Sequence, residues 1–196
     1  MSVFSKGKGW RIRVKPSAIA VWISFLAFDL SLYTLLLFVA ILLHECGHLV
    51  ALLLCNKTDI GITFSAFGAE ITYGGPLVGM GGELFVAGGG ILMNVFSCLL
   101  ILLLAYDHLA GCFFAVASLC LALLNLIPVK GLDGGRLLEG VLLRFLDPGK
   151  VYRVMRCISG VCIAGLFVCS LLVIWGSGFN FSLLLFTLYL SLSVLR

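Results

Sequence analysis

The sequence predicts an all-α polytopic membrane protein with about six transmembrane helices and a membrane-associated β-hairpin between the second and third helices. Of the 196 residues, 62% are hydrophobic and 11% are charged, and the mean hydropathy is +1.20. These values lie far from those of soluble domains. Apolar stretches near the roughly 20 residues that a spanning helix needs recur along the chain. They cover residues 17–28, 30–55, 83–105, 110–128, 157–175 and 179–195.

The first apolar stretch, residues 17–28, follows a basic segment, as the apolar region of a secretory signal peptide does. However, Pro16 opens the stretch and no small-x-small cleavage site follows it, so we expect a retained anchor. A run of about a dozen apolar residues also suits a buried or re-entrant segment. Whether this stretch fully spans the membrane therefore stays open.

The positions of the basic residues predict the topology. If the amino terminus is cytoplasmic and six spans alternate, all 13 Lys and Arg fall on the cytoplasmic side. The opposite loops, near Asp29, Asp107 and Gly176, carry none, as the positive-inside rule requires. We expect a multi-pass protein of the cell membrane with both termini and the opening of its functional site in the cytoplasm. The net charge of +4 then reflects topology and lipid contact, not nucleic-acid binding.

Two connections between the spans have recognisable patterns. After the second span, Ile60, Ile62 and Phe64 alternate with smaller or polar residues, and a turn at Phe67-Gly68 precedes a second alternating run, which predicts the hairpin. After the fourth span, Pro128 and Gly131 break the helix, and a short basic helix follows to about residue 145. A break at membrane depth is tolerated only where the backbone is buried in protein or lines a cavity.

We expect one domain over residues 1–196, with a functional core at about 16–150, extra helices at about 151–196 and no appended soluble domain. The eight cysteines form no CxxC pair, and seven of them lie in predicted spans. We therefore interpret them as reduced packing residues rather than as disulfide or metal ligands.

The second span contains His44-Glu45-Cys46-Gly47-His48, an HExxH pattern. Residues i and i+4 lie on one face of a helix, so His44 and His48 can bind the same zinc ion. The alternative is that neighbouring helices merely satisfy both imidazoles, although ionisable residues inside a membrane are costly and usually functional. In this pattern Glu45 does not bind the metal and instead acts as general base and acid.

A catalytic zinc needs a third protein ligand and leaves its fourth position to water. Asp133 is the best candidate, because it follows the helix break and precedes Gly134 and Gly135, which permit close approach. The alternative is that Asp133 only caps the short helix. One zinc ion per chain is the cofactor that this pattern implies.

The HExxH pattern at 44–48 together with the segment 125–135 resembles the site-2 protease family of intramembrane zinc metalloproteases, over about residues 10–150. The basic start before Pro16, the turn at Phe67-Gly68 and the segment 129–136 are most similar to its compact sporulation branch, which processes a membrane-tethered sigma-factor precursor. The resemblance implies regulated intramembrane proteolysis: hydrolysis of a peptide bond within or next to a transmembrane segment of a membrane protein.

The resemblance implies roles for individual residues. His44, His48 and Asp133 would be zinc ligands, Glu45 would be catalytic, and Asn125 would contact substrate or backbone near the site. Asn94 matches a third-span motif that lacks its proline here, so substrate binding and a plain interhelical hydrogen bond both stay open. The implied partners are a membrane-protein substrate, the lipid bilayer and a regulatory membrane protein.

Two other functions compete with proteolysis. A scaffold or metal-binding chaperone with the same fold would bind membrane partners without cleaving them, but it would not need Glu45. A transporter would also contain broken helices and buried ionisable residues. No inverted repeat appears in the sequence, and we expect His44, His48 and Asp133 to form one site instead of a route across the membrane.

Overall fold

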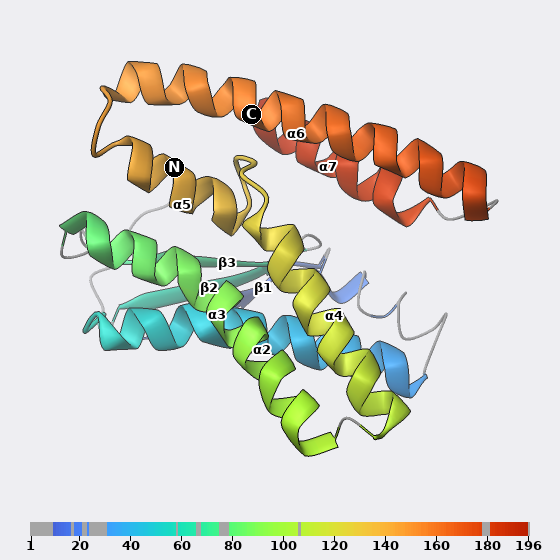
Figure 1. The fold of residues 1–196 in the computed structure, drawn as a ribbon. Helices are drawn as coiled ribbons and strands as arrows, with labels where there is room; N and C mark the ends of the chain where they lie inside the picture. The colour runs from blue at the N-terminus through green and yellow to red at the C-terminus, as the bar shows by residue number, and fades with distance from the viewer. Residues whose placement is uncertain are drawn as a thin grey trace.

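The computed structural model describes residues 10–16, 18–20, 23, 31–57, 59–65, 68–74, 79–105, 107–177 and 181–195. Among them, four helices are long and apolar enough to cross a membrane, which confirms the predicted helical polytopic fold class. These helices are α2 (Leu32–Leu54), α3 (Gly79–Ala105), α4 (Leu109–Leu126) and α6 (Pro148–Ser177) (Figure 1).

The first and sixth predicted spans have different outcomes. Most of the first, residues 17–28, lies outside the described residues. The sixth corresponds to α7 (Ser182–Leu195), a helix of 14 residues. At 1.5 Å per residue α7 is about 21 Å long, which is shorter than the roughly 30 Å hydrocarbon core of a bilayer.

The predicted hairpin is present and belongs to a three-stranded sheet. Strands β2 (Ile60–Ser65) and β3 (Gly68–Tyr73) pair antiparallel, and β1 (Arg11–Val14) pairs parallel with β2, which gives the order β1-β2-β3. Strand β1 was not predicted, although residues 11–14 alternate basic and apolar. Ile60 and Ile62 are buried against Leu52 of α2, so the sheet is fixed to the carboxyl-terminal end of that helix.

Local signals define both ends of α2. The Ser31 hydroxyl accepts a hydrogen bond from the Thr34 N–H at 3.3 Å and caps the first turn. At the other end Asn56 adopts a left-handed conformation with φ 57°, and the N–H groups of Asn56 and Lys57 bond to the carbonyls of Leu53 and Leu52. This is a Schellman motif, which satisfies the last carbonyls and turns the chain towards β2.

Helices α2 and α3 cross at their glycines. A Cβ added at Gly89 would lie 2.6 Å from the Gly47 carbonyl oxygen and 3.0 Å from the Ala51 Cβ. Only glycine therefore permits this backbone approach, as is common between helices in membranes. The crossing sets the register of α3 against the HExxH segment.

The break after α4 is also present. The chain leaves the helix at Leu126, passes through Gly131 with φ 105° and starts α5 (Asp133–Leu142). A Cβ at Gly134 would collide with the Leu126 carbonyl, and one at Gly135 with the Val129 carbonyl. The two glycines thus let the first turn of α5 fold back onto the segment 126–129.

Helices α6 and α7 pack side by side as a pair (Figure 1). The pair meets the rest of the fold at α5 and at a hydrogen bond of 3.0 Å from the Lys130 N–H to the Ser159 hydroxyl. All eight cysteines belong to the described part of the chain, and each is a free thiol there.

Candidate metal centre

Helix α2 presents both histidines of the HExxH pattern on its buried stripe, which also includes Ala40, Gly47 and Ala51. His44 is 7% exposed and His48 is 6% exposed. Their Nε2 atoms lie 3.3 Å apart, and their rings meet edge to face. The i, i+4 spacing therefore points both nitrogens at one position, as the sequence predicted.

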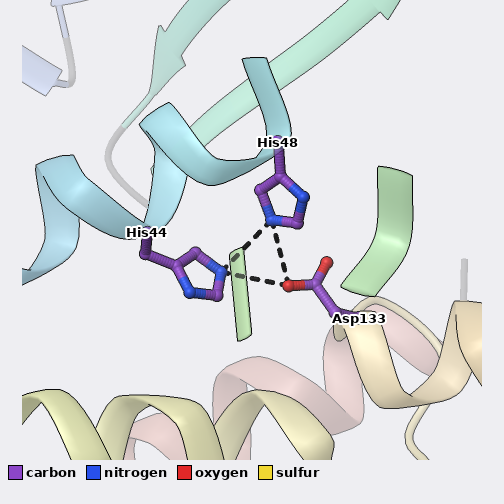
Figure 2. Close-up of side chains that lie close together, drawn as sticks. All are labelled: His44, His48 and Asp133. Atoms are coloured by element: carbon purple, nitrogen blue, oxygen red, sulfur yellow. Dashed lines mark hydrogen bonds and ion pairs between the residues drawn. The ribbon is translucent and has the colours of Figure 1, made fainter. Parts of the chain in front are cut away.

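Asp133 reaches the same position from the first residue of α5 (Figure 2). Its Oδ2 lies 3.0 Å from the Nε2 of His44 and 3.1 Å from the Nε2 of His48. The carboxylate is 6% exposed. The N-cap position of α5 is occupied by Leu132, so Asp133 lies in the first turn and its side chain contacts the two imidazoles.

The three converging atoms suit a tetrahedral cation. Ligand bonds of about 2.0–2.1 Å to zinc place neighbouring ligand atoms about 3.3–3.4 Å apart. The observed separations of 3.0, 3.1 and 3.3 Å are close to this value. His44, His48 and Asp133 are all buried, and their donor atoms fit a metal ion.

The charge on Asp133 is maintained at neutral pH. Burial alone would raise the pKa of this carboxyl, but the hydrogen bonds from His44 and His48 outweigh burial and lower the pKa to about 2. The second carboxylate oxygen, Oδ1, lies 3.8 Å from Nη1 of Arg136, whose side chain is 64% exposed. Asp133 therefore offers an anionic oxygen to the site.

Helix α3 supplies the partners of the outer ring nitrogens. The Nδ1 of His48 donates a hydrogen bond to the Val86 carbonyl oxygen at 2.8 Å. The side-chain nitrogen Nδ2 of Asn94 lies 3.3 Å from the Nδ1 of His44, and Asn94 is 0% exposed. Both imidazoles are thus held on two sides, by Asp133 at Nε2 and by α3 at Nδ1.

Gly90 of α3 lies against the inner ring nitrogens. A Cβ added there would lie 2.5 Å from the Nε2 of His48 and 2.7 Å from the Nε2 of His44. A side chain at this position would enter the space on which the three donor atoms converge. Gly89 thus serves the helix crossing, whereas its neighbour Gly90 lies at the site, a difference that no local sequence pattern indicates.

The remaining predicted residues lie at different distances from this group. Glu45 is half-buried beside His44 on α2 and interacts electrostatically with His48. The amide of Asn125 donates to the Leu121 carbonyl of its own helix at 3.0 Å. Asn94 contacts His44 across the helix interface, which agrees with the interhelical alternative. A substrate contact of Asn94 or Asn125 stays a prediction.

A comparison with solved structures finds the same fold in "Site-2 Protease from Methanocaldococcus jannaschii". The TM-score is 0.68, and the match covers 97% of this chain and 92% of that chain at 22% sequence identity. The predicted resemblance is therefore confirmed for the fold, while the sporulation branch stays a prediction. No protein-family model matches the chain, and no curated protein sequence matches it.

Replacing Gly90 by alanine should weaken zinc binding at least tenfold, because the new methyl group would occupy the approach to both Nε2 atoms. Isothermal titration of the detergent-purified protein with zinc would measure the change. Gly88→Ala is the matched control, since a Cβ there has only the Leu137 Cδ2 within reach, at 4.0 Å. Equal zinc affinity in Gly90→Ala and Gly88→Ala would contradict this description of the site.

Proposed function

We propose that this chain is an intramembrane zinc metalloendopeptidase of the site-2 protease family. It would hydrolyse a peptide bond within or next to a transmembrane segment of another membrane protein. The observation that supports this most directly is the buried group of His44, His48 and Asp133. Two of its members come from an HExxH helix, and the fold around it is shared with a site-2 protease.

The donor set suits zinc in a hydrolytic role. Two neutral imidazoles and one carboxylate leave a fourth position open, as catalytic zinc sites do. When bound, zinc supplies Lewis-acid polarisation of the scissile carbonyl and lowers the pKa of the attacking water. Neutral imidazoles also keep the charge of the site low, which matters in a segment surrounded by lipid.

Glu45 is the proposed proton carrier. Its carboxylate accepts a proton from the attacking water and delivers it to the amine nitrogen that leaves when the C–N bond breaks. Glu45 follows His44 on α2, so the helix that positions a ligand also positions the base. Glu45 is partly exposed, and in this mechanism its carboxylate contacts the attacking water.

The substrate must be locally extended before cleavage, because the carbonyl of a helical peptide bond is hydrogen-bonded and shielded. Within the described sheet, β3 is an edge strand. The Gly74 N–H bonds to the Asp59 carbonyl, so alternation in the antiparallel ladder turns the N–H groups of Ile71 and Tyr73 to the outer edge. We propose that an extended substrate segment pairs with this edge by strand addition.

The proposed topology places both termini and the opening of the site in the cytoplasm of the cell. Arg136, whose guanidinium reaches towards Asp133, is exposed, and Lys150 and Arg153 are exposed on the first turns of α6. Clustered basic residues favour the cytoplasmic side. A regulatory membrane partner stays a prediction.

Zinc binding and cleavage should depend on different residues. Wild type and Glu45→Gln should each bind about one zinc per chain, and Asp133→Ala should lose zinc because one of three ligands is removed. Elemental analysis of protein purified in detergent measures this. When the proteins are incubated with solubilised membranes from cells that lack this chain, only wild type should create new peptide termini near apolar spans. Loss of the general base should slow cleavage at least 100-fold.

Other outcomes of this experiment would support a different function. If the wild-type protein contains no zinc, the protease mechanism is ruled out and a scaffold function is favoured. Zinc binding with identical termini in wild type and Glu45→Gln would indicate a metal-binding chaperone or a transporter.

A matched pair of substitutions at Ile71 tests whether the substrate pairs with the edge of β3. Ile71→Pro removes the outward N–H and the isoleucine side chain, whereas Ile71→Ala removes only most of the side chain. We expect the proline variant to cleave a membrane substrate at least tenfold more slowly than the alanine variant, with equal zinc content. Equal cleavage by both variants would rule out strand addition at this position.

Reporter fusions test the topology. Green fluorescent protein fused after residue 196 should fluoresce when the chain is produced in a bacterium, because that protein matures in the cytoplasm. Alkaline phosphatase fused after residue 107, in the loop between α3 and α4, should be active because that loop faces outward. The reverse pattern would place the site on the opposite face of the membrane.

A further inference from the structure

Three residues of α3 contact the candidate metal centre from one side. Val86, Gly90 and Asn94 are spaced at i, i+4 and i+8, so they lie in one row along the helix. The Val86 carbonyl meets His48, the Gly90 backbone lies against both Nε2 atoms, and the Asn94 amide meets His44. Helix α3 therefore forms the wall behind the two imidazoles.

The contact with Val86 fixes the proton on His48. A backbone carbonyl can only accept a hydrogen bond, so the Nδ1 of His48 carries the proton and donates it over 2.8 Å. The Nε2 atom points to the position shared with Asp133 and His44, and a metal ion bound there would take the place of its proton. A metal ligand needs this tautomer.

His44 needs the same tautomer, but its partner is a side chain that can donate or accept. The Nε2 of His44 points to Asp133 and His48, so in a metal-binding site its proton must be on Nδ1. A protonated Nδ1 requires an acceptor, and the Asn94 amide is 3.3 Å away. Asn94 has one, its Oδ1, which is buried and has no partner among the described residues.

A 180° rotation of the Asn94 side-chain amide about its Cβ–Cγ bond exchanges the positions of Oδ1 and Nδ2. After this rotation Oδ1 accepts a hydrogen bond from the Nδ1–H of His44. In both orientations one amide atom contacts His44 and the other has no partner among the described residues. The two orientations therefore differ only in whether Asn94 donates to His44 or accepts from it. The carbonyl-acceptor orientation is the one compatible with two histidine ligands.

We propose that Asn94 is a positioning residue for His44: its side-chain carbonyl accepts the Nδ1 proton and holds the ring with Nε2 towards Asp133. This inference rests on the proposed metal site and assigns Asn94 to a ligand instead of to the substrate. Asn94 and the Val86 carbonyl then play equivalent parts, one for each histidine. Such outer partners typically change metal affinity 10- to 100-fold when they are removed.

The test measures binding of Co²⁺ alone, from its visible absorption, to the full chain in detergent. Asn94→Leu keeps a similar volume without a hydrogen bond and should lower the affinity 10- to 100-fold. Asn94→Asp keeps the acceptor and should bind within about threefold of wild type. Ser97→Ala is the control, since the Ser97 hydroxyl is buried on the same helix and donates to the Met93 carbonyl; its affinity should not change.

A second measurement does not depend on a variant that folds. The chain contains three histidines, so ¹⁵N-labelled histidine gives a simple NMR spectrum of the zinc-loaded wild type. Both ligand rings should show a protonated Nδ1, and a His44 ring without a proton on Nδ1 would overturn the role of Asn94.

Each result decides for or against the role of Asn94. Asn94→Leu with wild-type cobalt affinity overturns it, and a raised KM for cleavage would then assign Asn94 to the substrate. Asn94→Asp that binds as weakly as Asn94→Leu also overturns it, because the amide would then act as a donor. If wild type binds no metal, the proposed function fails as well; if wild type binds metal and cleaves, only the inference about Asn94 is at stake.

Discussion

The close approach of α2 and α3 is the constraint on which the site depends. At the crossing, Gly89 leaves no room for a side chain beside Gly47, and Gly90 lies directly against the inner nitrogens of both histidines. A wider crossing would break the 2.8 Å hydrogen bond from His48 to Val86 and move Asn94 away from His44. Helices in lipid gain little from apolar burial, so close van der Waals packing at small residues is what can fix this distance.

The second requirement is a helix that stops inside the fold. Pro128 has no N–H to donate, and the nearby donors have partners: the Lys130 N–H bonds to Ser159 and the Leu132 N–H to the Val129 carbonyl. This local satisfaction makes the break tolerable where lipid offers no hydrogen bonds. As a result α5 starts at Asp133, and a carboxylate 89 residues from His44 completes the group.

The arrangement also bears on the competing functions. Among the side chains whose burial the structure describes, the buried histidines and carboxylates are His44, His48 and Asp133, and they form one compact group. A transport path would need polar groups spread along a route across the membrane. A scaffold would need the fold but not Glu45 directly after His44. Proteolysis is the function that uses every member of the group together with Glu45.

The sequence by itself determined the features that depend on local spacing. Apolar runs gave the long spans, alternation gave the β2–β3 hairpin, and the four-residue interval gave His44 and His48 a common face. Tertiary structure decided the pairing of β1, the contact of Asn94 with His44 and the difference between Gly89 and Gly90. These depend on how far each helix is rotated about its axis and how closely it packs on its neighbour. No local pattern encodes that rotation, because it is set by contacts between residues about 40 to 50 positions apart.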